Sequence, residues 1–239
     1  MAPRILAIGG GGFLMEDSPS PIDRYVVQLA GTTRPRVCFV STPSGDPPEM
    51  IEKFYAAFEP LGCECSHLAF FRKPFRSSLP LSDFAAPLLQ QNVVFVGGGN
   101  TRSALAVWRE WGLHDDLRQA WSQGVLLAGM SAGALCWFAH GVTDSHWGAG
   151  LQPMTCLGFL PGACCVHYSG DPMRRPTLHA AMNDGVFDSA LAIDDGAAVL
   201  FSGSEISRVV AWSPNATAYR VTTSAGELQE RPLASEAIA

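Results

Sequence analysis

The sequence predicts an α/β protein whose mainly parallel, doubly wound sheet lies between helices in three layers, with a short antiparallel extension at the C-terminal end. Three observations lead to this fold class. Short apolar runs alternate with helical segments along the first half of the chain. Glycine follows several of these runs directly, which is typical of parallel strands buried on both faces. Right-handed crossovers between such strands place helices on both sides of the sheet.

The elements of the first half follow from these runs in chain order. Strands are expected at residues 5–8, 37–41, 63–68, 93–96 and 125–128. Helices are expected between them at residues 23–30, 49–61, 82–89, 101–111 and 114–122. Ligands of a doubly wound sheet bind outside the carboxyl ends of its strands. A functional site is therefore expected in the loops that follow these strands.

The last third of the chain has a different pattern. Short apolar runs at residues 190–193, 197–201, 208–212 and 219–221 are separated by turn-forming sequence. We interpret them as an antiparallel extension of the same sheet. The chain holds no internal repeat and no low-complexity linker, so a single domain over residues 1–226 is expected. Residues 227–239 are expected to form a loosely ordered tail.

Composition and charge exclude several classes of protein. An apolar content of 47 % with 16 % charged residues suits a compact protein with a large core. The net charge of −6, with no basic run longer than a pair such as Arg174-Arg175, argues against a nucleic-acid partner. No apolar run approaches the roughly 20 residues that span a membrane. Residues 4–9 lack the longer apolar region of a signal peptide, so a cytoplasmic location is expected.

The cysteines and glycines do not indicate a metal or a cofactor. Seven cysteines are an odd number for a disulfide framework, and a cytoplasmic protein would keep them reduced. Cys63, Cys65 and His67 alternate along one strand, but their spacing matches no common zinc site. Neither glycine cluster, at residues 9–12 or 97–99, fits a dinucleotide or P-loop motif. We therefore expect neither a metal nor a cofactor.

The most specific motif is Gly129-Met130-Ser131-Ala132-Gly133, which fits G-x-S-x-G. A buried strand is expected before it and helix-compatible residues follow it, which is the context of a nucleophile elbow. A serine on such a strained turn needs neighbours without bulk two positions away on each side, and both are glycine. The backbone N–H of Ala132 then lies where it can stabilise an oxyanion. The motif predicts a nucleophilic Ser131.

The glycine cluster at residues 97–99 is expected beside the elbow, at the same edge of the sheet. A glycine backbone N–H there can supply the second oxyanion donor, and Gly98 is the candidate. The cluster at residues 9–12 is interpreted as a tight turn beside the same edge.

Together these residues resemble the peptidase E family. The resemblance is carried by residues 96–101, by residues 129–134 and by His167, and it covers roughly residues 4–222. The loop at residues 43–46 and the segment at 194–197 are similar to a bacterial branch of the family. The resemblance implies a serine dipeptidase with a class I glutamine-amidotransferase-like, flavodoxin-like fold. Amidotransferases proper carry cysteine at the elbow, so Ser131 argues against glutamine hydrolysis.

The resemblance makes His167 the general base, since an elbow serine needs a group that accepts its proton. His167 follows a strand-like run and precedes a turn, whereas the loop residue His146 is the alternative. Peptidase E places an aspartate shortly after the elbow helix, and Asp144 occupies a similar position here. The other carboxylates that compete for this role are Asp171, Asp194 and Asp195.

The resemblance also suggests a substrate. Peptidase E enzymes cleave dipeptides with an N-terminal aspartate, and Arg174 or Arg175 could bind that carboxylate with two parallel hydrogen bonds. Asn100 and Thr101 are further expected substrate-binding residues. The expected partner is a small peptide, and a homodimer stays open. The alternatives are a β-aspartyl hydrolase similar to cyanophycinase and a non-catalytic family member that binds a small ligand.

Overall fold

An eight-stranded sheet forms the centre of the computed structural model, which describes residues 2–224 and 226–239. Its strand order is β14-β11-β10-β1-β5-β4-β2-β3. The pairs β1/β5, β5/β4, β4/β2 and β2/β3 are all parallel. The strands are β1 (Arg4–Ile8), β2 (Arg36–Val40), β3 (Glu64–Leu68), β4 (Val93–Val96), β5 (Leu126–Met130), β10 (Ala197–Ser202), β11 (Glu205–Ala211) and β14 (Glu236–Ala237).

The helices of the first half lie where the sequence predicts them. They are α1 (Pro21–Ala30), α2 (Pro48–Phe58), α3 (Ala85–Leu89), α4 (Thr101–Trp111) and α5 (Leu113–Ser122). Helix α1 begins earlier than expected because Ser20 and Asp23 form a capping box, in which each side chain accepts a hydrogen bond from the other's backbone N–H. Among the described residues, no helix has both the length and the apolar character needed to cross a membrane.

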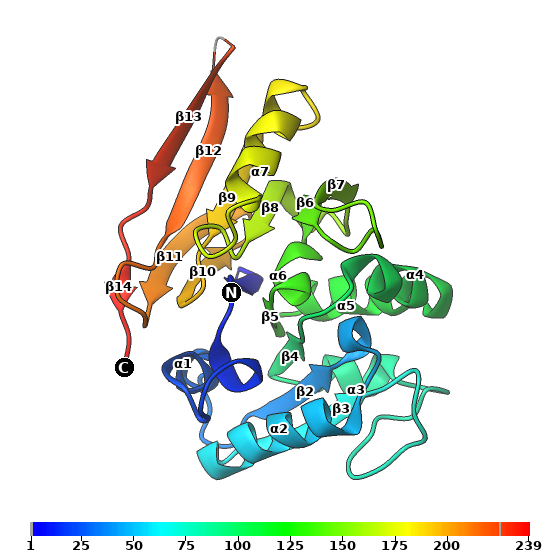
Figure 1. Ribbon diagram of the computed structural model, residues 1–239. Helices are drawn as coiled ribbons and strands as arrows, with labels where there is room; N and C mark the ends of the chain where they lie inside the picture. The colour runs from blue at the N-terminus through cyan, green and yellow to red at the C-terminus, as the bar shows by residue number, and fades with distance from the viewer. Residues whose placement is uncertain (1, 225) are drawn as a thin grey trace.

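The three layers follow from the alternation of side chains along the strands. Leu6 and Ile8 of β1 belong to the hydrophobic cluster that α1 and α2 cover. Ile5 and Ala7 point the other way, into the cluster shared with α3, α4 and α5. Figure 1 shows these helices around the parallel strands. The predicted fold class is thus confirmed.

A second sheet, which the sequence did not predict, accounts for most of the last third. Its order is β13-β12-β9-β8-β6-β7, with parallel pairing of β6/β8 and β8/β9. Helix α7 (Arg174–Asn183) provides the crossover from β8 to β9, so residues 190–193 join this sheet instead of extending the first. The strands are β6 (Phe138–Thr143), β7 (Gln152–Thr155), β8 (Leu160–Val166), β9 (Ser189–Ile193), β12 (Ala218–Ser224) and β13 (Glu227–Pro232).

The two sheets share buried side chains. Cys164 and Val166 of β8 belong to the same cluster as Ile5 and Ala7 of β1, whereas the opposite face of β8 packs against α7. Both sheets therefore contribute side chains to one hydrophobic core. Of the predicted antiparallel extension, β10 and β11 do extend the first sheet beyond β1.

The predicted loose tail at residues 227–239 is wrong. Strand β13 pairs along its whole length with β12, and β14 pairs with β11. Glu230 of β13 also accepts a hydrogen bond of 2.6 Å from the hydroxyl of Tyr168. The segment reads as polar because β13 is an edge strand, and edge strands keep charged side chains in solvent. Figure 1 shows the β12–β13 hairpin extending beyond α7.

His67, part of the alternating Cys63, Cys65 and His67 pattern, is a core residue. Its imidazole is buried in β3, and its Nδ1 lies 2.9 Å from the Tyr55 hydroxyl. Burial, and secondly the charge of Arg76, lower the pKa of His67 to about 4. The folded protein therefore holds this imidazole neutral.

We expect this histidine to make folding sensitive to acid. Between pH 6.5 and pH 4 the unfolded chain takes up a proton at His67 and the folded chain does not, so the free energy of unfolding falls as the pH falls. His67→Gln removes this proton uptake. The difference in the free energy of unfolding between the wild type and the variant should therefore become smaller as the pH falls. Urea titrations across this pH range measure it. A constant gap would contradict the argument.

Candidate active site

Ser131 lies at the carboxyl edge of the large sheet, immediately after β5, as the elbow motif predicts. Its backbone angles are φ 58° and ψ −114°, a conformation that is strained for a non-glycine residue. Such a turn directs the side chain outward from the sheet edge. Helix α6 (Ala132–Leu135), which follows, is only four residues long and leads directly into β6, so the elbow helix is shorter than expected.

The second glycine of the motif is required by a close backbone contact. A Cβ atom on Gly133 would lie 2.2 Å from the carbonyl oxygen of Val96, at the end of β4. Any side chain at position 133 would therefore push the elbow away from the neighbouring strand. This contact holds the nucleophile against the β4 loop.

His167 is brought to Ser131 by the second sheet. It directly follows β8, and its Nε2 lies 2.9 Å from the Ser131 Oγ. The backbone N–H of Tyr168 donates a hydrogen bond to the carbonyl oxygen of Ile193, which fixes the turn on β9. The alternative base, His146, lies 3.4 Å from the Arg102 guanidinium in a different loop. The structure thus brings together the predicted serine and the predicted histidine.

The carboxylate beside the imidazole is Asp195, which corrects the prediction of Asp144. The Nδ1 of His167 lies 2.5 Å from the Asp195 Oδ1. Asp144 is exposed at the end of β6, and among the described residues it has no hydrogen bond to His167. The physical reason is topological. Asp195 stands in the link from β9 to β10, and β10 is paired with β1, so this link crosses the sheet edge next to the elbow.

The two other candidate aspartates hold the histidine loop in place. Asp194 is buried and accepts hydrogen bonds from the backbone N–H groups of Ser169 and Thr217. Asp171 accepts one from the N–H of Met173 at the start of α7. Both carboxylates are thus engaged with backbone groups around the loop that carries His167.

Gly10 makes room for the histidine–aspartate pair, a role that the sequence did not predict. A Cβ atom at this position would lie 2.0 Å from the Asp195 Oδ1 and 2.9 Å from the His167 Nδ1. The backbone of Gly10 also pairs with that of Asp195 as an isolated bridge. The signal was present in the sequence, since a glycine run directly follows the strand that pairs with β5.

The backbone N–H groups of Ala132 and Gly98, the expected oxyanion donors, belong to residues that lie beside Ser131. Ala132 follows Ser131, and a Cβ atom on Gly98 would lie 3.4 Å from the Ser131 Cβ. Within the described ranges, neither N–H donates a hydrogen bond to another protein group. Both donors are therefore available to a carbonyl oxygen bound beside Ser131.

Asn100 and Thr101, expected to bind substrate, have structural partners instead. The Asn100 side chain caps α4 by accepting a hydrogen bond of 2.8 Å from the Ser103 N–H, and it donates to the Ser145 carbonyl oxygen. Thr101 is buried, and its N–H donates to the Ser145 hydroxyl. These residues attach the loop after β6 to the start of α4.

The two arginines of the expected carboxylate clamp lie away from Ser131. Arg174 is buried, where it donates to the Val142 carbonyl oxygen and to Asp171. Arg175 forms an ion pair of 3.1 Å with Glu230 on β13. Neither is among the residues that line the hollow beside Ser131 and His167, which is described next. The predicted clamp is therefore not formed.

A cleft of about 260 Å³ opens directly beside Ser131 and His167. Its walls come from the loop after β1, the end of β2, the start of α2 and the glycine cluster after β4. The residues that line it are Leu14, Met15, Phe39, Ser44, Met50, Gly97, Gly98, Gly99, Met130, Ser131 and His167. This volume is small compared with the roughly 300–1,000 Å³ of most ligand pockets.

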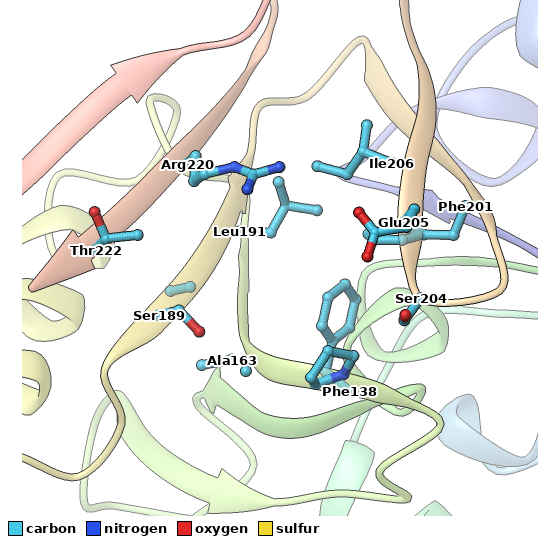
Figure 2. Close-up of a pocket in the computed structure, with 13 residues that line it drawn as sticks. Phe138, Ala163, Ser189, Leu191, Phe201, Ser204, Glu205, Ile206, Arg220 and Thr222 are labelled. Carbon is cyan, nitrogen blue, oxygen red and sulfur yellow. The ribbon is translucent and has the colours of Figure 1, made fainter.

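A second hollow, of about 220 Å³, lies between the two sheets near the turn from β10 to β11. That turn pairs with the start of β1, so the hollow is at the edge of the sheet opposite Ser131. Figure 2 shows Phe138, Leu191 and Ile206 around it, with Arg220 and Glu205 on different strands. Among the described residues, its lining includes Ser189, Ser204, Glu205 and Arg220 but no histidine.

The described residues include no group of three or more His, Cys, Asp or Glu side chains arranged to hold a metal ion. The alternating Cys63, Cys65 and His67 thus do not converge on one point with a further ligand.

Comparison with known proteins gives a consistent family. The family model "Peptidase family S51" matches residues 5–209. The protein YgaJ of Bacillus subtilis (strain 168), described as an uncharacterized peptidase, is 44 % identical over 231 residues, which is 96 % of each chain.

Two solved structures are similar in fold. A peptidase from an acI-B1 Actinobacterium superposes with a TM-score of 0.71 at 15 % identity, over 100 % of this chain and 97 % of that one. A candidate peptidase E protein from Listeria monocytogenes EGD-e superposes with a TM-score of 0.63 at 16 % identity, over 89 % of this chain and 100 % of that one.

The two candidate acids can be separated by mutation. Asp195→Asn keeps the shape of the side chain but removes the charge that would fix the imidazole tautomer, so we expect kcat to fall by about 10⁴-fold. Asp144→Asn, at an exposed residue without contact to His167, should stay close to wild type. Steady-state peptide hydrolysis measures both. A larger loss of kcat in Asp144→Asn than in Asp195→Asn would indicate that Asp144 is the acid that orients His167.

The role of Gly10 makes a separate prediction. In Gly10→Ala the new methyl group overlaps Asp195 and His167, and displacing them by about 1 Å should lower kcat roughly 10²-fold or more. Gly203→Ala is the matched control, because no atom lies within 4 Å of its Cβ position. It should cost about 1 kcal/mol of stability through its positive φ and leave kcat unchanged. Equal kcat losses in both variants would contradict the contact.

Proposed function

The chain belongs to peptidase family S51, the peptidase E family, and is a serine peptidase; within this class we propose a dipeptidase that works through an acyl-enzyme on Ser131. One observation carries the assignment of the nucleophile. Ser131, His167 and Asp195 form a continuous chain of hydrogen bonds at the open edge of the sheet, with the serine at its cleft end. This is the order of contacts that activates a hydroxyl for attack.

The first half of the reaction forms the acyl-enzyme. The Ser131 Oγ attacks the carbonyl carbon of the scissile peptide bond while the His167 Nε2 takes the hydroxyl proton. The negative charge that develops on the carbonyl oxygen is stabilised by the N–H groups of Gly98 and Ala132. The C–N bond then breaks, and His167 gives its proton to the leaving amine. The acyl group remains on Ser131 as an ester.

The second half returns the enzyme to its starting state. His167 accepts a proton from a water molecule, and the resulting hydroxide attacks the ester carbonyl. The C–O bond to Ser131 breaks, and the proton on Nε2 returns to the serine oxygen. During both halves Asp195 accepts the hydrogen bond from Nδ1 and stabilises the transient imidazolium.

The size of the cleft supports a small peptide as substrate. At about 260 Å³ it has room for one side chain and a short length of backbone. A dipeptide fits such a cleft without further contacts along the surface.

The cleft does not favour the N-terminal aspartate that the resemblance implies. An aspartate side chain requires a cation at the cleft, whereas Arg174 and Arg175 are engaged elsewhere and none of the described arginines and lysines lines the cleft. A cyanophycinase-like β-aspartyl hydrolase has the same requirement, because its substrate also presents a carboxylate beside the scissile bond.

A cytoplasmic location is supported by the state of the cysteines. All seven are free thiols. Burial raises the pKa of the Cys38 and Cys165 thiols to about 12, so they stay protonated and unreactive at neutral pH. None of the seven lines the cleft.

Substitution of the serine tests the proposal directly. In Ser131→Ala, peptide hydrolysis should fall by several orders of magnitude, because the nucleophile is absent while only one hydroxyl is lost. Wild-type protein should be labelled by a fluorophosphonate probe, and the variant should not. Circular dichroism is the control for folding. A folded Ser131→Ala variant that retains hydrolysis would eliminate the acyl-enzyme mechanism.

A further inference from the structure

The cleft beside Ser131 has a chemistry that identifies its ligand. We propose that it binds an apolar side chain of medium length, such as that of leucine or methionine, on the substrate residue whose carbonyl Ser131 attacks. The enzyme then prefers dipeptides with an apolar N-terminal residue. This inference rests on the proposed function and adds the substrate class to it.

The first support is the lining of the cleft. Five of its side chains are hydrocarbon or thioether groups, namely Leu14, Met15, Phe39, Met50 and Met130. The hydroxyl of Ser44 is already bonded to the Ser41 carbonyl oxygen at 2.8 Å. Apart from the catalytic pair, the cleft therefore offers apolar surface that a hydrocarbon side chain can cover.

The second support is that three charged side chains near the cleft line a different hollow. Glu16, Asp17 and Lys53 lie together around a neighbouring hollow, which Leu14 and Met15 separate from the cleft. Glu16 is further held by the indole N–H of Trp212 at 2.9 Å. A carboxylate in the cleft would thus lose its hydration and gain no cation in exchange.

The third support is the order of groups along the sheet edge. Strand β5 lies between β1 and β4, and β2 lies beyond β4. His167 stands on the β1 side of Ser131, where Asp195 pairs with Gly10. Because His167 protonates the leaving amine, that amine must lie on the β1 side. The acyl part of the substrate then lies on the opposite side, toward Gly98 on the β4 loop and Phe39 on β2.

The methionines set the range of side chains that fit. Methionine is unbranched and adapts to different shapes, so a cleft with three of them accepts several apolar residues. Met15 is 55 % exposed and lies at the mouth. The expected ligands are thus leucine, methionine and phenylalanine, and not one of them exclusively.

The experiment compares dipeptides that differ only in the N-terminal residue. Purified full-length protein is assayed with Leu-Leu, Met-Leu, Phe-Leu, Asp-Leu and Lys-Leu. We expect kcat/KM for the three apolar substrates to exceed that for Asp-Leu and Lys-Leu by about tenfold or more, since a charged side chain would be desolvated without a partner. Equal or faster cleavage of Asp-Leu would overturn the inference and leave the serine peptidase intact.

A second measurement separates the inference from the dipeptidase proposal. Diphenyl aminoalkylphosphonates of leucine and of aspartate react with a serine nucleophile through an O–P bond and release phenol, so they probe the cleft without a peptide leaving group. Faster inactivation by the leucine compound, with no dipeptide cleaved, would support the apolar cleft and overturn the dipeptidase proposal. Equal rates would overturn the apolar cleft. A complete lack of reaction and of cleavage would overturn both.

A variant that introduces a cation tests whether Met50 forms part of the cleft wall. Met50→Arg places a cation in the cleft, and it should shift the kcat/KM ratio of Leu-Leu to Asp-Leu toward Asp-Leu by about tenfold. The ratio is taken within one variant, so a smaller folded fraction cancels. Met173→Arg, at an exposed methionine outside the cleft, is the matched control. An unchanged ratio in Met50→Arg would overturn the assignment.

Discussion

The close approach of the β1 end to the β9–β10 connection is the constraint on which the site depends. Gly10 lets the backbone of β1 meet Asp195, and the same link carries Asp195 to the imidazole of His167. Ser131 comes from the first sheet and His167 from the second, so the catalytic chain crosses the junction between the sheets. A shift of either sheet by a fraction of a hydrogen-bond length would separate the nucleophile from its base. Packing of the second sheet therefore sets the distance between the Ser131 Oγ and the His167 Nε2.

The same junction explains why titratable groups lie on one side of Ser131 and apolar groups on the other. The titratable groups His167 and Asp195 lie on the β1 side, where Asp195 is partly open to solvent and Asp194 accepts a hydrogen bond from the Ser169 N–H. The β4 and β2 side is apolar and carries the free backbone N–H of Gly98. An acyl group held there is enclosed by uncharged groups, which strengthens the oxyanion hydrogen bonds because little water competes for them. The β12–β13 hairpin contacts the loop that carries His167, because Glu230 of β13 accepts a hydrogen bond from the Tyr168 hydroxyl.

The sequence predicted what local patterns determine. The parallel strands, five helices, Ser131 and His167 follow from apolar runs, a strained glycine-flanked turn and a family resemblance. Asp144 was wrong because the partner of an imidazole depends on which connection crosses the sheet edge, and the β1–β10 pairing that brings Asp195 there is not encoded by spacing. The tail was wrong because an edge strand with polar side chains has the composition of a disordered segment. The carboxylate clamp at Arg174 and Arg175 was wrong because closeness in sequence to His167 does not determine the direction of a helical side chain. Arg174 donates a hydrogen bond to the Val142 carbonyl oxygen of β6.

Direct detection of the acyl-enzyme tests whether Ser131 is the nucleophile. A leucine ester is mixed with the protein, the reaction is quenched with acid in the steady state, and the digested protein is analysed by peptide mass spectrometry. We expect a leucyl group esterified to the peptide that contains Ser131, present in wild type and absent in Ser131→Ala. Continued turnover with no adduct, or an adduct on a different residue, would contradict it.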